Sequence, residues 1–498
     1  MQHCDRFFCP LLAVITLSAC QPGTSPPEAL PETPDLVFQN ARVMDPESGL
    51  NAVRDVGITD GTIVAISEIP IEAPEIIDAS GLVLAPGFID LHAHGQDAVS
   101  NRLQALDGVT TALELELGVY PVANWIASRE GDAVIHYGAS VGHLGARMKL
   151  FHDADLGSWA TLSPERTDLL TFSDFEEKDT TEEERARLKE LMALGLDEGG
   201  LGFGLGITYT PGASRSEIFE LFELASDRDV PLFVHTRGRN SGGALGSFQE
   251  GIANAAATGA SLHFVHLNSS SGELAPTVLS LIRGARDLGI DVTTEAYPYT
   301  AGSTRIESAS YDSWVGRDDA AFNSLLWPAT GERLTAESFA RYREEGGWVI
   351  SGNRSEETNA WIVAQPDVMV ASDGIPFLYG PAHPRGSGTF SRILGYYSRD
   401  QETLSLMDAL KKMTLLPAQR LENIAPVMRN KGRIRLGADA DITLFDPDTV
   451  LDRSTYEQGD IPSQGIVHVL VSGTFVVRNS ELIEGIFPGR AIQSEQSR

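Results

Sequence analysis

The stretch "GFIDLHAHG" (residues 87–95) places His92 and His94 directly after an apolar run. Side chains at positions i and i+2 of a strand point to the same side, so these two imidazoles can bind a single cation. On its own, such a pair fits a structural role equally well. The ends of the other apolar runs therefore decide how this stretch is interpreted.

Three further apolar runs end in a residue that can bind a metal. His235 ends "DVPLFVH", His266 ends "ASLHFVH" and Asp373 ends "PDVMVASD". An acidic side chain at such a position is costly to bury unless it is paired or bound to a metal. His263 lies three residues before His266, faces the other side of its strand and is expected to pack. Four strand ends of this kind together predict one metal site.

A fifth run contributes carboxylates. Residues 112–118, "ALELELG", have strand character and carry Glu114 and Glu116 on the same face. Carboxylates that point into a barrel need a counter-charge, which a divalent metal would supply. Glu116 is nearer the end of the strand and is the first candidate ligand, with Glu114 one layer deeper. The alternative is a solvated strand face.

The order of elements predicts a fold in which these strand ends meet. Across residues 86–429, apolar runs alternate with helical stretches such as residues 180–199, which favours parallel βα units. Several hundred residues of this pattern predict an α/β fold, a (β/α)8 TIM barrel, with its chemistry at the strand ends. Residues 35–85 and 430–490 are β-rich and are predicted to pair into a small β-sandwich domain. Residues 306–363 exceed an ordinary βα loop and predict a lid insertion.

The composition limits the class of protein. The chain has 498 residues, of which 42% are apolar and 7% aromatic, as in an ordinary soluble globular protein. This length suits one large barrel with a second unit. The net charge of −31 argues against nucleic-acid binding, because such a surface repels phosphate groups.

The first residues predict an export signal. Residues 7–17 are apolar but too few to span a bilayer, and the "LSAC" that follows resembles the lipobox of bacterial lipoproteins. The resemblance implies removal of residues 1–19 and acylation of Cys20 at the cell envelope. Gln21, in place of Asp, favours the outer membrane facing the periplasm, and an ordinary secretory signal is the alternative. Residues 20–34, rich in proline, would form a flexible tether. All three cysteines lie by residue 20, so a metal site must use His, Asp and Glu.

The motifs taken together resemble those of the amidohydrolase superfamily, and within it the N-acyl-D-amino-acid deacylase (D-aminoacylase) branch. They run in order over nearly the whole mature chain: "APGFIDLHAHG", "GVTT", "GLGFGLGITYTPG", "FVHTRGRN", "FVHLNSSSG", "EAYPYTAGST", "ASDGIP" and "HPRGSGTFSRILG". The resemblance implies a metal-dependent hydrolase of amide C–N bonds that uses zinc. It makes His92, His94, His235, His266 and Asp373 metal ligands, with Asp373 also the general base and acid.

Two positions depart from that branch. Where the branch carries a zinc-binding cysteine, this chain has Leu117, preceded by Glu116. A carboxylate is a natural bridge between two cations, so one or two Zn²⁺ ions are expected and a binuclear site bridged by Glu116 is favoured. The branch often has lysine two residues after His266, where this chain has Asn268. A preference for acidic substrate side chains is therefore in doubt.

The resemblance also suggests how substrate is bound. It assigns Arg385 to the substrate's α-carboxylate, since a guanidinium pairs with two carboxylate oxygens. Tyr297 and Tyr299 are further candidate contacts, with aromatic packing as the alternative, and His143 and His383 are placed near the pocket without a role. The expected substrates are N-acyl-D-amino acids or D-dipeptides. A cyclic-amide hydrolase, a dipeptidase and a non-catalytic ligand-binding lipoprotein are alternatives, and the oligomeric state stays open.

Overall fold

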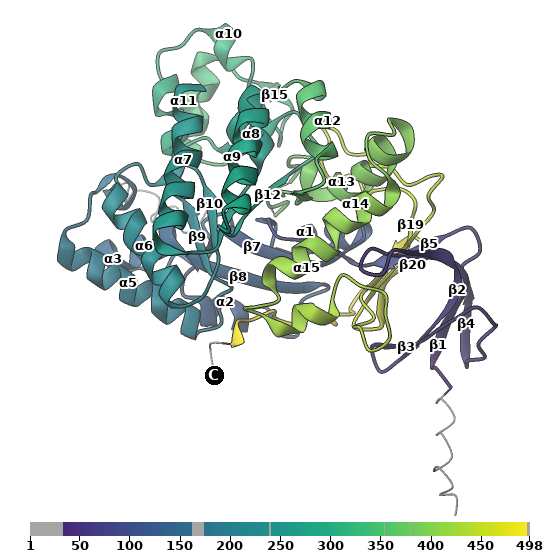
Figure 1. Cartoon of the computed structure of the whole chain (residues 1–498). Coiled ribbons are helices and arrows are strands. Elements are labelled where there is room, and N and C mark those ends of the chain that lie inside the picture. The colour runs from purple at the N-terminus through teal and green to yellow at the C-terminus, as the bar shows by residue number, and fades with distance from the viewer. Residues whose placement is uncertain (1–32, 162–173, 239–240, 353, 379, 496–498) are drawn as a thin grey trace, which may run out of the picture. The chain divides into compact units, whose positions relative to one another are not determined.

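The computed structural model describes residues 33–161, 174–238, 241–352, 354–378 and 380–495. The predicted signal segment, Cys20 and nearly all of the predicted tether lie outside these residues. Residues Pro34–Arg498 form one compact unit (Figure 1). Among the described helices, none combines the length and the apolar content that a membrane crossing requires.

Eight parallel strands form a nearly closed barrel, which confirms the predicted fold class. In chain order these strands are β6 (Phe88–Asp90), β7 (Val109–Val119), β8 (His136–Gly142), β9 (Phe203–Gly206), β10 (Leu232–His235), β11 (Leu262–Phe264), β12 (Val292–Ala296) and β17 (Val368–Val370). Just past the ends of β6 and β17, Ala93 bridges Gly374, and the amide of Gly95 donates to the carbonyl of Gly374 at 2.8 Å. The residues that follow the first and last strands are thereby held side by side.

Helices cover the outside of the barrel (Figure 1). Those that follow its strands are α1 (Ala98–Leu106), α2 (Val122–Ala127), α3 (His143–His152), α4 (Asp174–Glu177), α5 (Glu182–Asp197), α6 (Arg215–Asp227), α7 (Ser241–Thr258), α8 (Leu267–Ser271), α9 (Ala275–Asp287), α13 (Arg385–Arg392), α14 (Leu406–Met413) and α15 (Leu415–Leu421). The helix expected within residues 180–199 is α5, which begins with a capping box between Thr181 and Glu184. Helix residues such as Leu191 pack with strand residues such as Phe233 in the largest buried cluster.

A nine-stranded sheet combines the two ends of the chain. It contains β1 (Leu36–Asp45), β2 (Leu50–Thr59), β3 (Thr62–Ser67), β4 (Glu75–Asp78), β5 (Val83–Pro86), β18 (Ile442–Phe445), β19 (Ile466–Val471), β20 (Thr474–Arg478) and β21 (Glu481–Leu482). The two ends meet where β5 runs antiparallel to β18, with Leu84 opposite Leu444. Strand β5 leads directly into β6, so this sheet fixes the entry to the first barrel strand.

The chain between β12 and β17 is a folded insertion. It contains a four-stranded antiparallel sheet and short helices: β13 (Gly302–Arg305), α10 (Asp319–Phe322), β14 (Leu326–Trp327), β15 (Glu332–Arg333), α11 (Ala336–Glu345), β16 (Trp348–Ser351) and α12 (Glu356–Ala364). Its side chains, among them Ile306, Phe322 and Phe339, form an apolar cluster of their own. The predicted lid segment therefore has an internal core, and its movement stays a prediction.

Candidate metal centre

The structure brings all six predicted ligands together at the ends of the barrel strands. Each lies in or just after a different strand, apart from the first pair: His92 and His94 after β6, Glu116 in β7, His235 in β10, His266 after β11 and Asp373 after β17. Their donor atoms form two groups, each spanning no more than 4.8 Å. One group contains His92, His94, Glu116 and Asp373, and the other contains Glu116, His235 and His266. Glu116 belongs to both.

The two carboxylate oxygens of Glu116 face different histidine pairs. Its Oε2 lies 2.8 Å from Nε2 of His92 and 2.9 Å from Nε2 of His94. Its Oε1 contacts Nδ1 of His235 and lies 3.5 Å from Nε2 of His266. Each carboxylate oxygen of Glu116 thus has a histidine pair of its own.

Polar partners on the outer side of three imidazoles orient the rings. Nδ1 of His94 lies 2.8 Å from Oε2 of Glu114, and Nδ1 of His266 lies 3.0 Å from the hydroxyl of Ser270. Nδ1 of His92 lies 2.6 Å from Oε1 of Glu295. Such contacts leave Nε2 directed at the centre, as in protein metal sites. Glu114 therefore sits behind His94, and both glutamates of β7 are buried, which excludes a solvated strand face.

Glu295 is a residue that the sequence reasoning missed. It ends the run "VTTE" in β12, an acidic residue within a β-branched stretch, which is the same pattern that drew attention to Glu116. The other oxygen of Glu295 lies 3.2 Å from Nε2 of His263. Nδ1 of His263 contacts the hydroxyl of Thr293 at 2.7 Å. His263 is buried against Phe233, as expected, and it also belongs to a polar chain that ends at His92.

Burial and neighbouring charge set the protonation of the cluster. Burial alone would lower the pKa of His92, but the carboxylates of Asp373 and Glu116 raise it well above its ordinary value. In the same way burial would raise the pKa of Glu116, yet His235 and His92 hold it well below its ordinary value. Without a cation, the imidazoles would have to carry protons to balance the buried carboxylates.

The donor set fits a divalent metal. Nε2 of His92 and Nε2 of His94 are 3.1 Å apart, as are Nδ1 of His235 and Nε2 of His266. Two ring nitrogens at this distance repel each other unless a proton or a cation lies between them. Imidazole nitrogens with carboxylate oxygens are donors that zinc and related divalent metals accept. The cluster is therefore a metal site by its chemistry.

Asp373 forms a second close pair, with Arg385. Nη1 of Arg385 lies 2.7 Å from one oxygen of Asp373, and Nη2 donates to the other at 2.8 Å. Burial would raise the pKa of Asp373, but Arg385 and His92 hold it below its ordinary value. The backbone of Asp373 is in the left-handed region with φ 52°, a conformation that non-glycine residues adopt mainly where surrounding structure enforces it.

The two predicted tyrosine contacts have different surroundings. The ring centroid of Tyr297 lies 4.8 Å from the guanidinium carbon of Arg385. The hydroxyl of Tyr299 instead donates to Asp452 at 3.1 Å. Tyr299 is thus engaged with the C-terminal segment, whereas Tyr297 lies beside Arg385, and neither tyrosine lines the cavity that lies over the cluster.

A cavity of about 150 Å³ lies over the cluster. Its floor contains the donors His94, Glu116, His266 and Asp373 together with Arg385. Its remaining walls include residues of the insertion and of the loop after β9: Tyr209, Gly302, Ser303, Trp348, Ser351, Gly352 and Arg354. The ring of Trp348 stacks on His94 with centroids 6.2 Å apart. The insertion therefore takes part in the site.

Other polar residues near the barrel mouth have partners elsewhere. His143 contacts Oε1 of Glu217 at 2.7 Å, and His383 contacts the carbonyl of Ala301 at 3.1 Å. The amide nitrogen of Asn268 donates to the carbonyl of Tyr297 at 2.8 Å and to Oδ1 of Asn359 at 2.9 Å. The structure thus gives these side chains positions away from the donor atoms.

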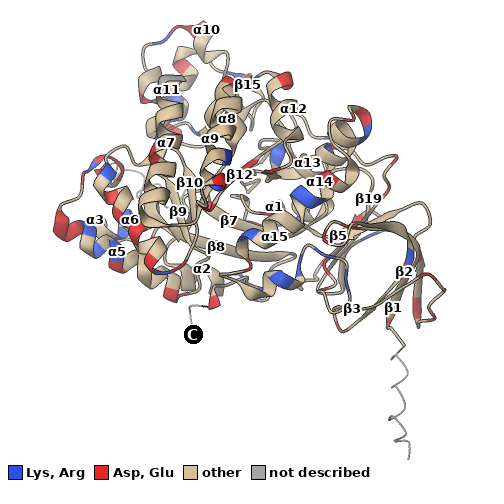
Figure 2. Cartoon of the chain, viewed as in Figure 1, with Lys and Arg blue, Asp and Glu red and all other residues tan. Residues whose placement is uncertain are grey.

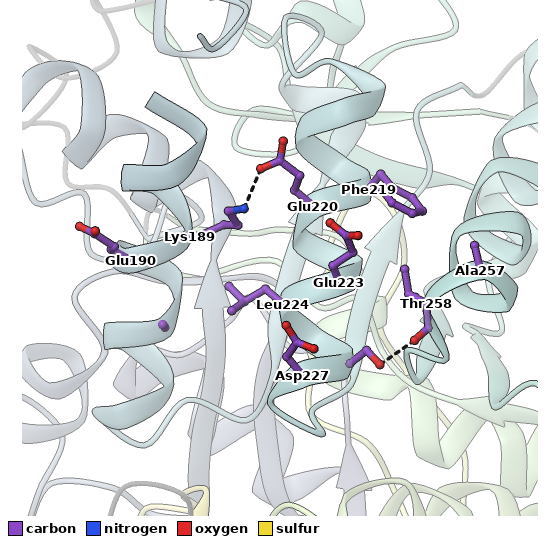
Figure 3. A pocket seen from close by; sticks show the side chains of 11 residues that line it. Lys189, Glu190, Phe219, Glu220, Glu223, Leu224, Asp227, Ala257 and Thr258 are labelled. Atoms are coloured by element: carbon purple, nitrogen blue, oxygen red, sulfur yellow. Dashed lines mark hydrogen bonds and ion pairs between the residues drawn. The ribbon is translucent and has the colours of Figure 1, made fainter. Parts of the chain in front are cut away.

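A larger cavity, about 690 Å³, lies on the outside of the barrel between α5, α6 and α7 (Figure 3). Its walls carry Glu190, Glu220, Glu223 and Asp227, and Lys189 pairs with Glu220 at 2.9 Å. Figure 2 shows that acidic residues are frequent on α5 and α6. This groove is part of the solvated acidic surface and lies away from the strand ends.

Comparisons with known proteins agree with this site. The profile of the "Amidohydrolase family" matches residues 75–141. An N-acyl-D-glutamate deacylase of Alcaligenes xylosoxydans xylosoxydans is 31% identical, over 93% of this chain and 97% of that protein. A D-aminoacylase of the same organism is 27% identical over 92% and 97%. The crystal structure of an N-acyl-D-glutamate deacylase of Bordetella bronchiseptica, complexed with zinc and a phosphonate inhibitor, superimposes with a TM-score of 0.77 at 26% identity, covering 93% of this chain and 100% of that one.

Proposed function

Because this chain belongs to the N-acyl-D-amino-acid deacylase branch of the amidohydrolase family, we infer that it hydrolyses the amide C–N bond of N-acyl-D-amino acids or D-dipeptides. One observation carries this inference. Glu116 stands between two histidine pairs, with Asp373 beside it, under a small cavity at the mouth of the barrel. This arrangement suits the hydrolysis of an amide by water and needs no covalent nucleophile.

We propose that the site holds two Zn²⁺ ions. His92, His94, Glu116 and Asp373 would hold one, and Glu116, His235 and His266 the other, with Glu116 as the bridge. A bound zinc ion would supply a nucleophile at neutral pH, because it lowers the pKa of water to about 7. The support for two ions is that each carboxylate oxygen of Glu116 faces its own histidine pair.

We assign the proton transfer to Asp373. Its carboxylate is held ionised by Arg385 and His92, so it can accept a proton from the attacking water. Asp373 would then donate this proton to the departing amine nitrogen. We assign the α-carboxylate of the substrate to Arg385, which lies against Tyr297 beside Asp373. The substrate's carboxylate would then be fixed next to the bond that breaks.

A substrate panel tests this function. Purified protein, as isolated, after chelation and after Zn²⁺ is restored, is assayed with N-acetyl-D- and N-acetyl-L-amino acids, D- and L-dipeptides and hydantoins. We expect turnover of the D-compounds, its loss on chelation and its return with Zn²⁺. A preference for hydantoins or L-dipeptides would select a cyclic-amide hydrolase or a dipeptidase instead. Absence of turnover with a fully loaded metal site would support a ligand-binding role.

We also propose that the protein is a lipoprotein of the bacterial cell envelope, acylated at Cys20 and anchored to the outer membrane on its periplasmic side. The support is the "LSAC" sequence after a short apolar segment. Expression with a radiolabelled fatty acid, followed by membrane fractionation, tests this. We expect label and protein in the outer-membrane fraction, and Cys20→Ser to lose both. An unlabelled, soluble periplasmic wild type would indicate an ordinary secretory signal.

A further inference from the structure

A line of polar side chains runs through the interior of the barrel and ends at His92. Nδ1 of His92 lies 2.6 Å from Oε1 of Glu295, and Oε2 of Glu295 lies 3.2 Å from Nε2 of His263. Nδ1 of His263 then lies 2.7 Å from the hydroxyl oxygen of Thr293. The line therefore connects a metal ligand, through Glu295, with His263 and Thr293.

The sequences of strands β11 and β12 produce this line. His263 lies opposite Thr293 in the parallel pairing of the two strands, and Glu295 lies two residues after Thr293, on the same side of β12. Phe264, next to His263, packs against Phe248 of α7 and so faces the helices outside the barrel. His263, Thr293 and Glu295 therefore face the interior.

The line begins at the opposite end of the barrel from the metal cluster. Thr293 is partly buried and lines a cavity of about 500 Å³. The other walls of this cavity include Pro231, Ser261 and Asp367, which lie just before β10, β11 and β17. The metal ligands lie instead at the far ends of the strands, so the line crosses the barrel interior from one end of the strands to the other.

The chemistry of each group sets the direction of the hydrogen bonds in the line. Burial lowers the pKa of His263, so its ring is neutral and carries one N–H. A carboxylate only accepts hydrogen bonds, so the N–H of His263 is at Nε2, where Glu295 accepts it. Nδ1 of His263 then keeps its lone pair, and the hydroxyl of Thr293 donates to it. In the same way Glu295 accepts from Nδ1 of His92, which leaves the lone pair of Nε2 directed at the cluster.

We propose that Thr293 and His263 position the metal ligand His92 by fixing which of its ring nitrogens carries the proton. This inference rests on the metal site of the proposed function. By donating to Nδ1, Thr293 favours the tautomer in which His263 donates to Glu295. This hydrogen bond holds the carboxylate of Glu295 where Nδ1 of His92 can donate to it. A hydroxyl group at the far end of the barrel thus strengthens metal binding without contacting the metal.

The test removes one hydroxyl group at a time from β12. Thr293→Val keeps the shape of the side chain but cannot donate to His263. Zinc affinity, measured by competition with a chromogenic chelator, should therefore fall by about 2- to 10-fold, the range of one neutral hydrogen bond. Thr293→Ser keeps the donor and should keep the affinity near that of wild type. Thr294→Val is the matched control, because the hydroxyl of Thr294 donates to the carbonyl of Phe264 at 2.9 Å and its loss should leave zinc affinity unchanged.

A spectroscopic signature separates positioning from a merely structural role. Nitrogen NMR of the zinc-loaded protein with isotope-labelled histidine reports which ring nitrogen carries the proton. The signals that vanish in His263→Gln belong to His263. We expect its proton at Nε2 in wild type and in Thr293→Ser, and a shifted Nδ1 resonance in Thr293→Val, where Nδ1 has lost its donor.

Four results would each overturn the inference. They are a proton at Nδ1 of His263 in wild type, an unchanged zinc affinity in Thr293→Val, an equal loss of affinity in Thr294→Val, and a Thr293→Ser variant as weak as Thr293→Val. The wild-type spectrum decides the question even if Thr293→Val fails to fold. None of these results concerns turnover, so the proposed function can stand when the inference fails. A wild type that binds no zinc would instead contradict the metal site itself, on which both rest.

Discussion

Two buried clusters of imidazole and carboxylate in this molecule differ in how the negative charge of the carboxylate is balanced. In the metal cluster, Glu116 is surrounded by four imidazoles. In the second, which we call the Glu217 cluster (His143, Arg147, Thr180 and Glu217), the carboxylate meets a guanidinium. Nη1 of Arg147 donates to both oxygens of Glu217, at 2.6 Å and 2.7 Å. His143 and Thr180 each contact Glu217 at 2.7 Å.

The difference lies in which cation balances the carboxylate. A guanidinium is permanently charged and only donates hydrogen bonds. Arg147 therefore balances the charge of Glu217 in the folded chain, and no further cation is needed. An imidazole can instead be neutral and offer a lone pair. The imidazoles around Glu116 therefore leave the charge balance to be completed by a bound cation. The same residue types thus form a structural ion network in one place and a metal site in another.

The largest expected effect concerns chemistry at the metal cluster. Asp373→Asn removes the proposed proton acceptor and should lower kcat by about 10²- to 10⁴-fold on the best D-substrate of the panel. The variant should still bind metal, because the four histidines and Glu116 remain. Steady-state kinetics with metal analysis by mass spectrometry measures both quantities. A variant that keeps near-wild-type kcat would remove Asp373 from the proton transfer.

The Glu217 cluster should respond in stability rather than in metal content. Glu217→Gln leaves Arg147 buried opposite a neutral side chain, which should lower the free energy of unfolding by about 3 to 5 kcal/mol. Chemical denaturation measures this loss, with Glu220→Gln as the control because the pairs of Glu220 are partly exposed and should contribute below about 1 kcal/mol. Loss of bound metal in folded Glu217→Gln would show that the two clusters are coupled. It would contradict the view that the Glu217 cluster is structural and independent of the metal cluster.

The sequence was informative where a local rule applies. His235, His266 and Asp373 each follow an apolar run, and parallel strands bring such ends to one edge of a barrel, so their meeting could be predicted. Glu295 obeys the same rule and could have been found as an acidic residue in a β-branched run. The roles of these residues remain predictions.

Contacts across long sequence separations could not be predicted. The hydroxyl of Tyr299 meets Asp452, 153 residues away, so its direction depends on how the C-terminal segment packs against the barrel. Trp348 and Arg354 reach the cavity only because the insertion folds around its own core. The pattern of apolar residues predicts strands and helices, but it does not predict where the sheet of the insertion packs on the barrel. The pairing of Arg385 with Asp373 likewise depends on the turn that leads into α13.

A smaller effect is expected from the residue that orients His92. Glu295→Gln keeps the size of the side chain but weakens its contact with Nδ1 of His92, and should reduce metal affinity by about 10- to 100-fold. Competition with a chromogenic zinc chelator measures the affinity. The matched control is Asp291→Asn, just before the same strand, whose carboxylate pairs with Arg420 away from the cluster. Equal weakening in both variants would indicate a general loosening of β12 instead of an effect on His92.

The smallest effect is a pH dependence of stability in the Glu217 cluster. Burial would raise the pKa of Glu217, but His143 and Arg147 lower it to about 2. A carboxyl whose pKa is lower in the folded state stabilises the fold above its unfolded value of about 4.3. This contribution is lost as the pH falls toward 2, by about 1 kcal/mol per pH unit.

The pKa of His143 is also lowered, first by burial, so its protonation in the unfolded chain works in the same direction below about pH 6.5. The difference in unfolding free energy between wild type and Glu217→Gln, measured at pH 7, 5, 4 and 3, removes the contributions of groups that do not contact Glu217 and leaves those of Glu217 and His143. We expect this difference to be constant from pH 7 to 5 and to shrink below pH 4. A difference that stays constant to pH 3 would mean that Glu217 is not the charged partner of Arg147. The Glu217 cluster would then lack the permanent ion pair that distinguishes it from the metal cluster.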